Sequence, residues 1–225
     1  MYFFFRKTFI LVWKDLLIDL RRKDNIPSML SFLFMNLLIF QFAIGEDTKI
    51  FMSTLPGIIW VAFLFTGVLG LGKSFLQETE SDCMGGLLIA PVDRSVLFLG
   101  KMISNTFFLL ITQFIFIPSV IFLFDIELSS WMGLFFLILF GTVGLSSLGT
   151  LLSALTSSVK SKEMLLPVLI FPLMIPGLLC VVNLTEFLFF GTNIEEVWSW
   201  WKLLIGFDVI LFTVSLLGFE FVIEE

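Results

Sequence analysis

Residues 67–74, in the first half of the chain, match the phosphate-binding loop pattern G-x-x-x-x-G-K-[ST] of nucleotide-hydrolysing proteins. That motif works where a strand ends and a helix begins, so that free backbone N–H groups and the lysine hold phosphate oxygens. Here it lies within the apolar stretch 55–75, where an open loop would leave backbone groups unpaired in lipid at several kcal/mol each. We therefore interpret the match as a coincidence, in which Gly67 and Gly70 allow close helix packing and Lys73 marks the cytoplasmic boundary.

The residue types that usually carry catalysis or metal binding are scarce. The chain contains no histidine, which removes the commonest transition-metal ligand, the usual haem ligand and the Ser–His and Cys–His nucleophile pairs. Its two cysteines, Cys83 and Cys180, fall in a predicted loop and a predicted spanning helix, so we expect no disulfide. We expect a non-catalytic chain that itself binds no cofactor and no metal.

A strongly apolar composition predicts a membrane protein. Of the 225 residues, 58% are hydrophobic and 30 are phenylalanine, and the mean hydropathy is +1.06. Soluble domains are only about 45–50% apolar. The sequence therefore predicts an all-α, polytopic membrane protein in which residues 1–225 form a single membrane domain. The net charge of -6 says little about partners, because the placement of charge matters more than its sum.

Six apolar segments are long enough to cross a bilayer as helices. They are residues 28–44, 55–75, 101–124, 131–155, 164–184 and 202–222. The second begins at Leu55 and has Pro56 in its first turn, a position that suits proline.

An amphipathic helix is predicted before the first span, over residues 2–24. Its apolar residues recur at helical spacing on one face and its basic residues on another, which is typical of a helix in the cytoplasmic membrane interface. The apolar set is Phe9, Trp13, Leu16, Leu17 and Leu20, and the basic set is Lys7, Lys14 and Arg21.

The distribution of lysine and arginine predicts the orientation of the spans. Eleven of these residues lie in the N-terminal segment and in the second-to-third and fourth-to-fifth connections. The opposite set of connections holds two, Lys49 and Lys202. The positive-inside rule then places both termini in the cytoplasm.

Two of the spans carry unusual residue patterns. The fourth has small residues four apart, a stripe that allows close packing either within the subunit or against another subunit. This stripe is Thr142, Ser146, Thr150, Ala154 and Ser158. In the fifth span prolines remove backbone donors, so we expect this helix to be bent or partly broken and to lie in the protein interior. These helix-kinking residues are Pro167, Pro172 and Pro176.

One acidic residue, Asp208, lies about two turns into the sixth predicted span. Charges at such a depth are costly and usually functional, which is one interpretation. The other is that Asp208 reaches the outer membrane interface beside Lys202. The outer loop predicted over residues 185–201 carries three tryptophans, which we interpret as an interfacial belt.

A charged segment, residues 77–94, separates the second and third spans. Acidic residues precede an apolar run there, an order that suits a helix N-terminus. A short amphipathic helix of this kind either fits a groove of a cytoplasmic ATPase or lies on the membrane surface, and the residue types leave both interpretations open. In the first, the ATPase-coupling residues are Glu78, Met84, Gly85, Leu87, Leu88 and Pro91.

Several short motifs resemble those of one family of membrane proteins. They are PGIIWVA at 56–62, the acidic and apolar loop that ends at Pro91, Gly100-Lys101, and LP…FPLMIP at 166–176. Together they cover most of the chain in order and look like CcmB, the haem exporter protein B family. That family is a membrane subunit of the cytochrome c maturation ABC transporter.

The resemblance implies a six-helix fold like that of ABC-2 permeases, in the bacterial inner membrane. It implies a CcmA-like ATPase that binds ATP, CcmC-like and CcmD-like membrane subunits, and a CcmE-like periplasmic haem chaperone, with no nucleic acid. In that family the haem-binding motif belongs to CcmC. The resemblance thus implies a chain that couples ATP hydrolysis to helix movement and to release of the haem-loaded chaperone, without ligating haem itself.

Two other functions remain open from the sequence. An ABC-2 type permease that exports a lipid, a polysaccharide or a drug would show the same helix pattern, and its gene neighbourhood would differ. A membrane-embedded enzyme or nucleotide-binding protein built on residues 67–74 would bind nucleotide without a partner.

Overall fold

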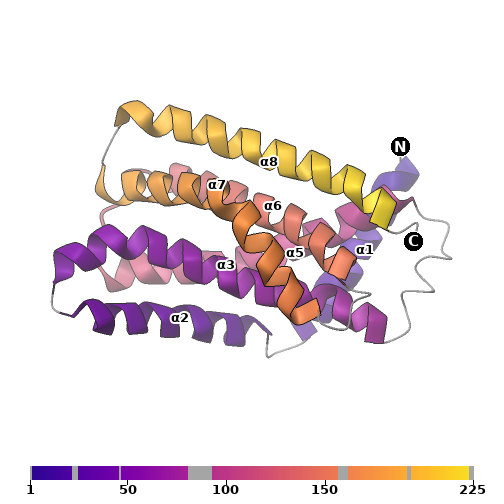
Figure 1. Cartoon of the computed structure of the whole chain (residues 1–225), viewed down its shortest axis with the longest axis horizontal. Helices are drawn as coiled ribbons and strands as arrows, with labels where there is room; N and C mark the ends of the chain where they lie inside the picture. The colour runs from indigo at the N-terminus through magenta and orange to yellow at the C-terminus, as the bar shows by residue number, and fades with distance from the viewer. Residues whose placement is uncertain are drawn as a thin grey trace.

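A computed structural model describes residues 2–21, 25–45, 47–80, 93–156, 162–191 and 194–222 of the chain. Within these residues every regular element is an α-helix, and the helices run side by side along most of the molecule (Figure 1). They are α1 (Tyr2–Arg21), α2 (Asn25–Ile44), α3 (Thr48–Glu80), α5 (Arg94–Leu123), α6 (Trp131–Thr156), α7 (Lys162–Phe190) and α8 (Ile194–Val222).

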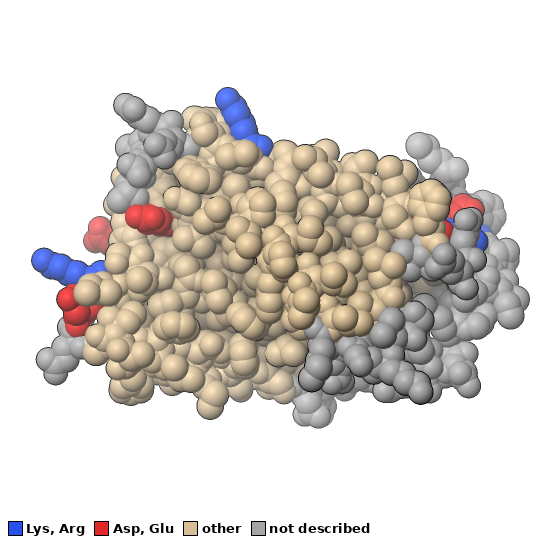
Figure 2. Space-filling model, viewed as in Figure 1, with Lys and Arg blue, Asp and Glu red and all other residues tan. Residues whose placement is uncertain are grey.

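Six of the described helices, α2 to α8, are long and apolar enough to cross a membrane, as the sequence predicts. Both termini lie at the same end of the bundle, which an even number of spans requires (Figure 1). Figure 2 shows a broad band without charged residues along the face in view, with lysines and acids toward the ends of the molecule. Such a band is what the hydrocarbon layer of a bilayer requires.

Helix α1 does not run with the bundle but crosses it at the end where the termini lie, and it packs against α5 (Figure 1). Thr8, Val12 and Asp15 are buried against the protein. Phe9 and Trp13 are 67% and 57% exposed, so α1 keeps an apolar face free. A helix with one face on the protein and one apolar face free is suited to the membrane interface.

Several predicted boundaries are wrong, among them the start of the third span, which is Arg94 and not residue 101. Helix α3 begins at Thr48, so Pro56 lies in its third turn and not in its first. The predicted outer loop 185–201 is mostly helical, because α7 continues to Phe190 and α8 already begins at Ile194. The cause is the same in the last two places: polar residues at a membrane surface remain helical beyond the apolar run that defines the span.

The proline-rich helix α7 is continuous through all three of its prolines, although it changes direction between its two halves (Figure 1). It is not the interior helix that the sequence predicts. Pro172 and Pro176 are exposed, and only 33% of its most apolar stretch is buried. One face packs on α3, α6 and α8, and the opposite face, with Val168 and Leu179, is open. Whether the individual prolines cause the change of direction stays a prediction.

Helix α6 lies at the centre of the bundle, where it packs against α3, α5, α7 and α8. Its small residues permit these contacts: Thr142, Ser146 and Thr150 are fully buried. Of the two interpretations of the small-residue stripe, the structure supports packing within the subunit. Ser158, the last member of the stripe, lies outside the described residues.

The α3–α6 contact depends on the missing side chain of Gly149, which gives a test. A methyl group there would overlap Cδ1 of Leu71, a residue that is 1% exposed and whose carbonyl oxygen accepts a hydrogen bond from Ser153. We expect Gly149→Ala to cost about 1–3 kcal/mol of stability, because overpacking forces neighbouring side chains out of their rotamers. Gly206→Ala, which meets nothing within 4 Å, is the matched control with the same gain in helix propensity. Thermal unfolding of the purified chain in detergent measures both, and equal midpoints would contradict the packing.

Candidate functional site

Of the predicted ATPase-coupling residues, only Glu78 lies within the described part of the chain. Glu78 lies in the last turn of α3, where the structure describes the backbone alone. Met84, Gly85, Leu87, Leu88 and Pro91 lie outside the described residues. The two helix ends that flank them, at Glu80 and Arg94, are on the same side as both termini (Figure 1). The contacts that these residues make therefore remain predictions.

Helix α5, which follows the coupling segment directly, is joined at its first turn to the last turns of α8. The Ser95 hydroxyl donates to Oε1 of Glu220 at 2.9 Å, and Nη1 of Arg94 donates to the Glu220 carbonyl oxygen at 3.3 Å. Exposed polar contacts of this kind contribute little on their own. Beneath them, the rings of Phe98 and Phe219 pack 5.3 Å apart and are 0% and 1% exposed. This buried aromatic pair joins the end of α8 to the start of α5.

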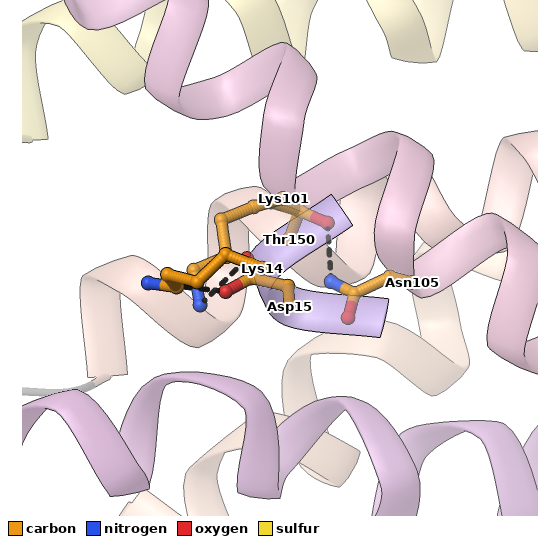
Figure 3. A network of polar contacts seen from close by, with 5 residues as sticks. All are labelled: Lys14, Asp15, Lys101, Asn105 and Thr150. Atoms are coloured by element: carbon orange, nitrogen blue, oxygen red, sulfur yellow. Dashed lines mark hydrogen bonds and ion pairs between the residues drawn. The ribbon is translucent and has the colours of Figure 1, made fainter. Parts of the chain in front are cut away.

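A charged contact joins the same part of α5 to α1 (Figure 3). Oδ2 of Asp15 lies 3.3 Å from Nζ of Lys101, and Oδ1 lies 3.2 Å from Nζ of Lys14. The side chains of Asp15 and Lys101 are only 9% and 13% exposed, so this ion pair is largely removed from water. Gly100 permits the approach, because a Cβ there would stand 3.0 Å from Cβ of Leu11.

One turn further along α5, polar side chains contact α6. Nδ2 of Asn105 donates to Oγ1 of Thr150 at 3.0 Å, and Figure 3 shows this bond beside the Asp15–Lys101 pair. The Ser146 hydroxyl donates to the Met102 carbonyl oxygen at 2.8 Å and accepts from Thr106 at 2.7 Å. Interhelical hydrogen bonds within membranes contribute about 0.6 kcal/mol each, so their number matters more than any single one.

Together these contacts make the coupling end of α5 the meeting point of three helices. It carries an ion pair to α1, a buried aromatic contact to α8 and polar contacts to α6. A displacement of the segment that precedes Arg94 would therefore reach all three helices at once. The arrangement can transmit movement.

The sequence did not point to Asp15, and it marked Lys101 only as a positive charge and as part of the Gly100-Lys101 motif. The partners are far apart in the chain, and nothing local connects them. One signal was present: Asp15 is an acid in the middle of a helix that the basic residues otherwise dominate. An acid there needs a cation, and the sequence does not say which one.

The phosphate-loop match lies inside the uninterrupted helix α3, as interpreted from its apolar surroundings. Its backbone N–H groups are thus engaged in helical hydrogen bonds. Gly67 faces α6, where a Cβ would stand 2.7 Å from Cδ2 of Leu145, and Gly70 faces Met29 of α2. Both glycines permit close helix packing, which confirms the role that the sequence analysis gives them.

Asp208 lies in the interior and not at the outer interface beside Lys202. It is 6% exposed, whereas Lys202 is exposed at the surface of the same helix. The α8 span begins at Val197, so Asp208 is eleven residues from its start and deeper than the two turns that the sequence predicts. The carboxyl borders a small cavity between α3, α6, α7 and α8.

Comparison with known proteins adds the family. The model of the CcmB protein family matches residues 6–224. The heme exporter protein B of Haemophilus influenzae is 26% identical over 176 residues, which cover 78% of this chain and 80% of the relative. That of Pseudomonas aeruginosa is 28% identical over 159 residues, 71% of each chain, and that of Rhodobacter capsulatus is 26% identical over 169 residues, 75% and 78%. Since the family match extends over nearly the whole chain, the chain belongs to the CcmB protein family.

Proposed function

We propose that this chain is the multi-pass membrane permease subunit of a bacterial ABC transporter that handles haem for cytochrome c maturation. The observation that carries this function is the family match over residues 6–224, together with relatives that are themselves heme exporter proteins B. A permease for a lipid, a polysaccharide or a drug is not favoured, because the relatives share one function by name.

In this proposal ATP is hydrolysed by a separate CcmA-like ATPase and not by this chain. The coupling segment 77–94 binds the ATPase at the cytoplasmic end of the bundle, where both termini also lie. Its movement displaces the first turns of α5 and, through Lys101 and Phe98, also α1 and α8. That displacement helps a CcmE-like chaperone to leave with its haem.

Haem is held elsewhere in the complex. The chain contains no histidine, the side chain that most often ligates haem iron. We assign haem ligation to a CcmC-like membrane subunit, accompanied by a CcmD-like one, and movement to this chain. The proposal requires no cofactor bound by this subunit.

The coupling segment gives the first functional test. Replacing Leu87 and Leu88 together by aspartate places two charges in the apolar run that would enter the ATPase groove. We expect the ATPase no longer to co-purify, while the chain remains inserted in the membrane. Ser130→Asp, in an exposed turn at the other end of the bundle, is the control, because aspartate can still cap the N–H of Gly133 as the serine does. Unchanged co-purification of the double variant would mean that the segment only anchors to the membrane.

The Asp15–Lys101 pair gives the second test. Lys101→Met leaves a largely buried carboxylate without its partner on α5, and Asp15→Asn does the converse. We expect each single substitution to cost about 1–3 kcal/mol and to lower the yield of mature cytochrome c. The double variant should lose less than the sum of the two, since it leaves no unpaired charge.

The control for this pair is Lys49→Met, an exposed lysine at the opposite end of the bundle. Thermal unfolding and cytochrome c yield are measured for all four variants. If the two single costs simply add in the double variant, the pair does not hold α1 to α5.

A further inference from the structure

Asp208 lies at the midpoint of its helix. It is the fifteenth of the 29 residues of α8, which places it about 21 Å from either end at 1.5 Å of rise per residue. Since α8 is long enough to cross the bilayer, this depth is close to the membrane centre. An acidic side chain at that depth is energetically costly, and such residues usually have a function.

Among the described residues, the structure gives one oxygen of this carboxyl no hydrogen-bond donor. Oδ2 is fully buried and has no hydrogen-bond partner among the described residues. The residues that line the cavity with it carry no charge, among them Trp60 of α3, Leu145 of α6, Met174 of α7 and Phe207 of α8. The nearby ionisable group on α7 is the buried thiol of Cys180, which offers no positive charge.

Other charged side chains on the four surrounding helices do not border this cavity. Those that the structure describes are Lys49, Glu186, Lys202 and Glu220. An ionised carboxylate would thus stand in an apolar site without a counter-charge, at a penalty of several kcal/mol. A buried group in this position avoids that penalty by becoming neutral.

The cavity is small and is shaped by glycines. A methyl group at Gly144 would overlap Oδ1 of Asp208, and a Cβ at Gly141 would stand 2.7 Å from Cη2 of Trp60. The free volume beside the carboxyl is about 20 Å³, which is enough for one water molecule. The packing therefore leaves space for a carboxyl and one molecule of the size of water.

A metal ion does not fit this site. Hard cations need several oxygen ligands, and Asp208 supplies the carboxylate oxygens alone. The indole N–H of Trp60, the other polar group in the lining, already donates to Thr185 at 2.6 Å. Among the described residues no group of three or more acids, cysteines or histidines lies together.

We propose that Asp208 is a proton-binding site at the centre of the membrane, served by one water molecule in the adjoining cavity. A hydronium ion in the cavity gives its proton to the carboxylate: an O–H bond of the hydronium breaks, an O–H bond to Asp208 forms, and neutral water remains. The site is loaded in the packed arrangement of α6, α7 and α8 seen here. This inference does not depend on which substrate the complex handles.

Infrared difference spectroscopy on the full chain in lipid vesicles tests the proposal. Wild type minus Asp208→Asn should show the carbonyl stretch of a protonated carboxylic acid at neutral pH, and the band should shift when water is replaced by D₂O. Asp125→Asn, an exposed acid in the turn between α5 and α6, is the matched control and should remove no such band. Wild-type chain carrying ¹³C-labelled aspartate must move the same band, which shows that the band belongs to an aspartate and not to a glutamate even if Asp208→Asn folds poorly.

Two results would overturn the proposal. Absence of a protonated carboxyl band at neutral pH would mean that Asp208 is ionised and paired with a cation. A band that stays unshifted in D₂O would mean that the proton does not exchange with water in the cavity. Asp208 would then be a permanently protonated side chain and not a site that binds and releases a proton.

Discussion

The first two turns of α5 are the part of the molecule on which the account of its movement depends. There, within eight residues, Ser95 and Phe98 contact α8 and Lys101 forms its ion pair with α1. The Asp15–Lys101 pair is largely buried, and breaking one side of such a pair costs more than forming it gains. A pair of this kind is therefore better suited to keeping two helices in one fixed relation than to adding net stability. We infer that α1, α5 and α8 move together at this end of the bundle.

The other spanning helices surround α6, and the way they pack on it follows from the properties of lipid as a solvent. In lipid no hydrophobic effect drives apolar helices together, so close packing and interhelical hydrogen bonds must hold them in contact. Helix α6 accordingly presents hydroxyls and glycines where neighbours approach: Ser146 and Thr150 to α5, Gly149 to α3, and Gly144 to Asp208 of α8. The same features that close the bundle thus also shape the small cavity beside Asp208 at its centre.

The sequence predicts the fold class well because hydropathy in a membrane protein leaves few alternatives. The length of the apolar segments predicts the six spans, and the helical spacing of apolar and basic residues predicts the amphipathic helix at the start. The cost of unpaired backbone groups in lipid predicts that the phosphate-loop match is helical. The boundaries are less accurate, because α3 and α8 continue as helices beyond their apolar runs. That error also made Asp208 appear shallower than it is.

The site is harder to predict than the fold. The Asp15–Lys101 contact joins residues far apart in sequence, and local patterns cannot choose among several lysines. The prediction that the α7 helix is interior is wrong. It rests on the backbone donors that prolines remove, but the helix stays continuous and its Pro172 and Pro176 are exposed. The contacts proposed for Leu87 and Leu88 lie outside the described residues, so they stay a prediction.

Side-selective labelling of Cys83 tests the central claim most directly, because this native cysteine lies within the coupling segment. In a Cys180→Ser background, a membrane-impermeant maleimide should react with Cys83 in inverted vesicles and not in intact spheroplasts. Binding of the partner ATPase should protect it. Labelling from the outer side, or labelling in inverted vesicles that the ATPase leaves unchanged, would contradict a cytoplasmic segment through which the ATPase moves α5.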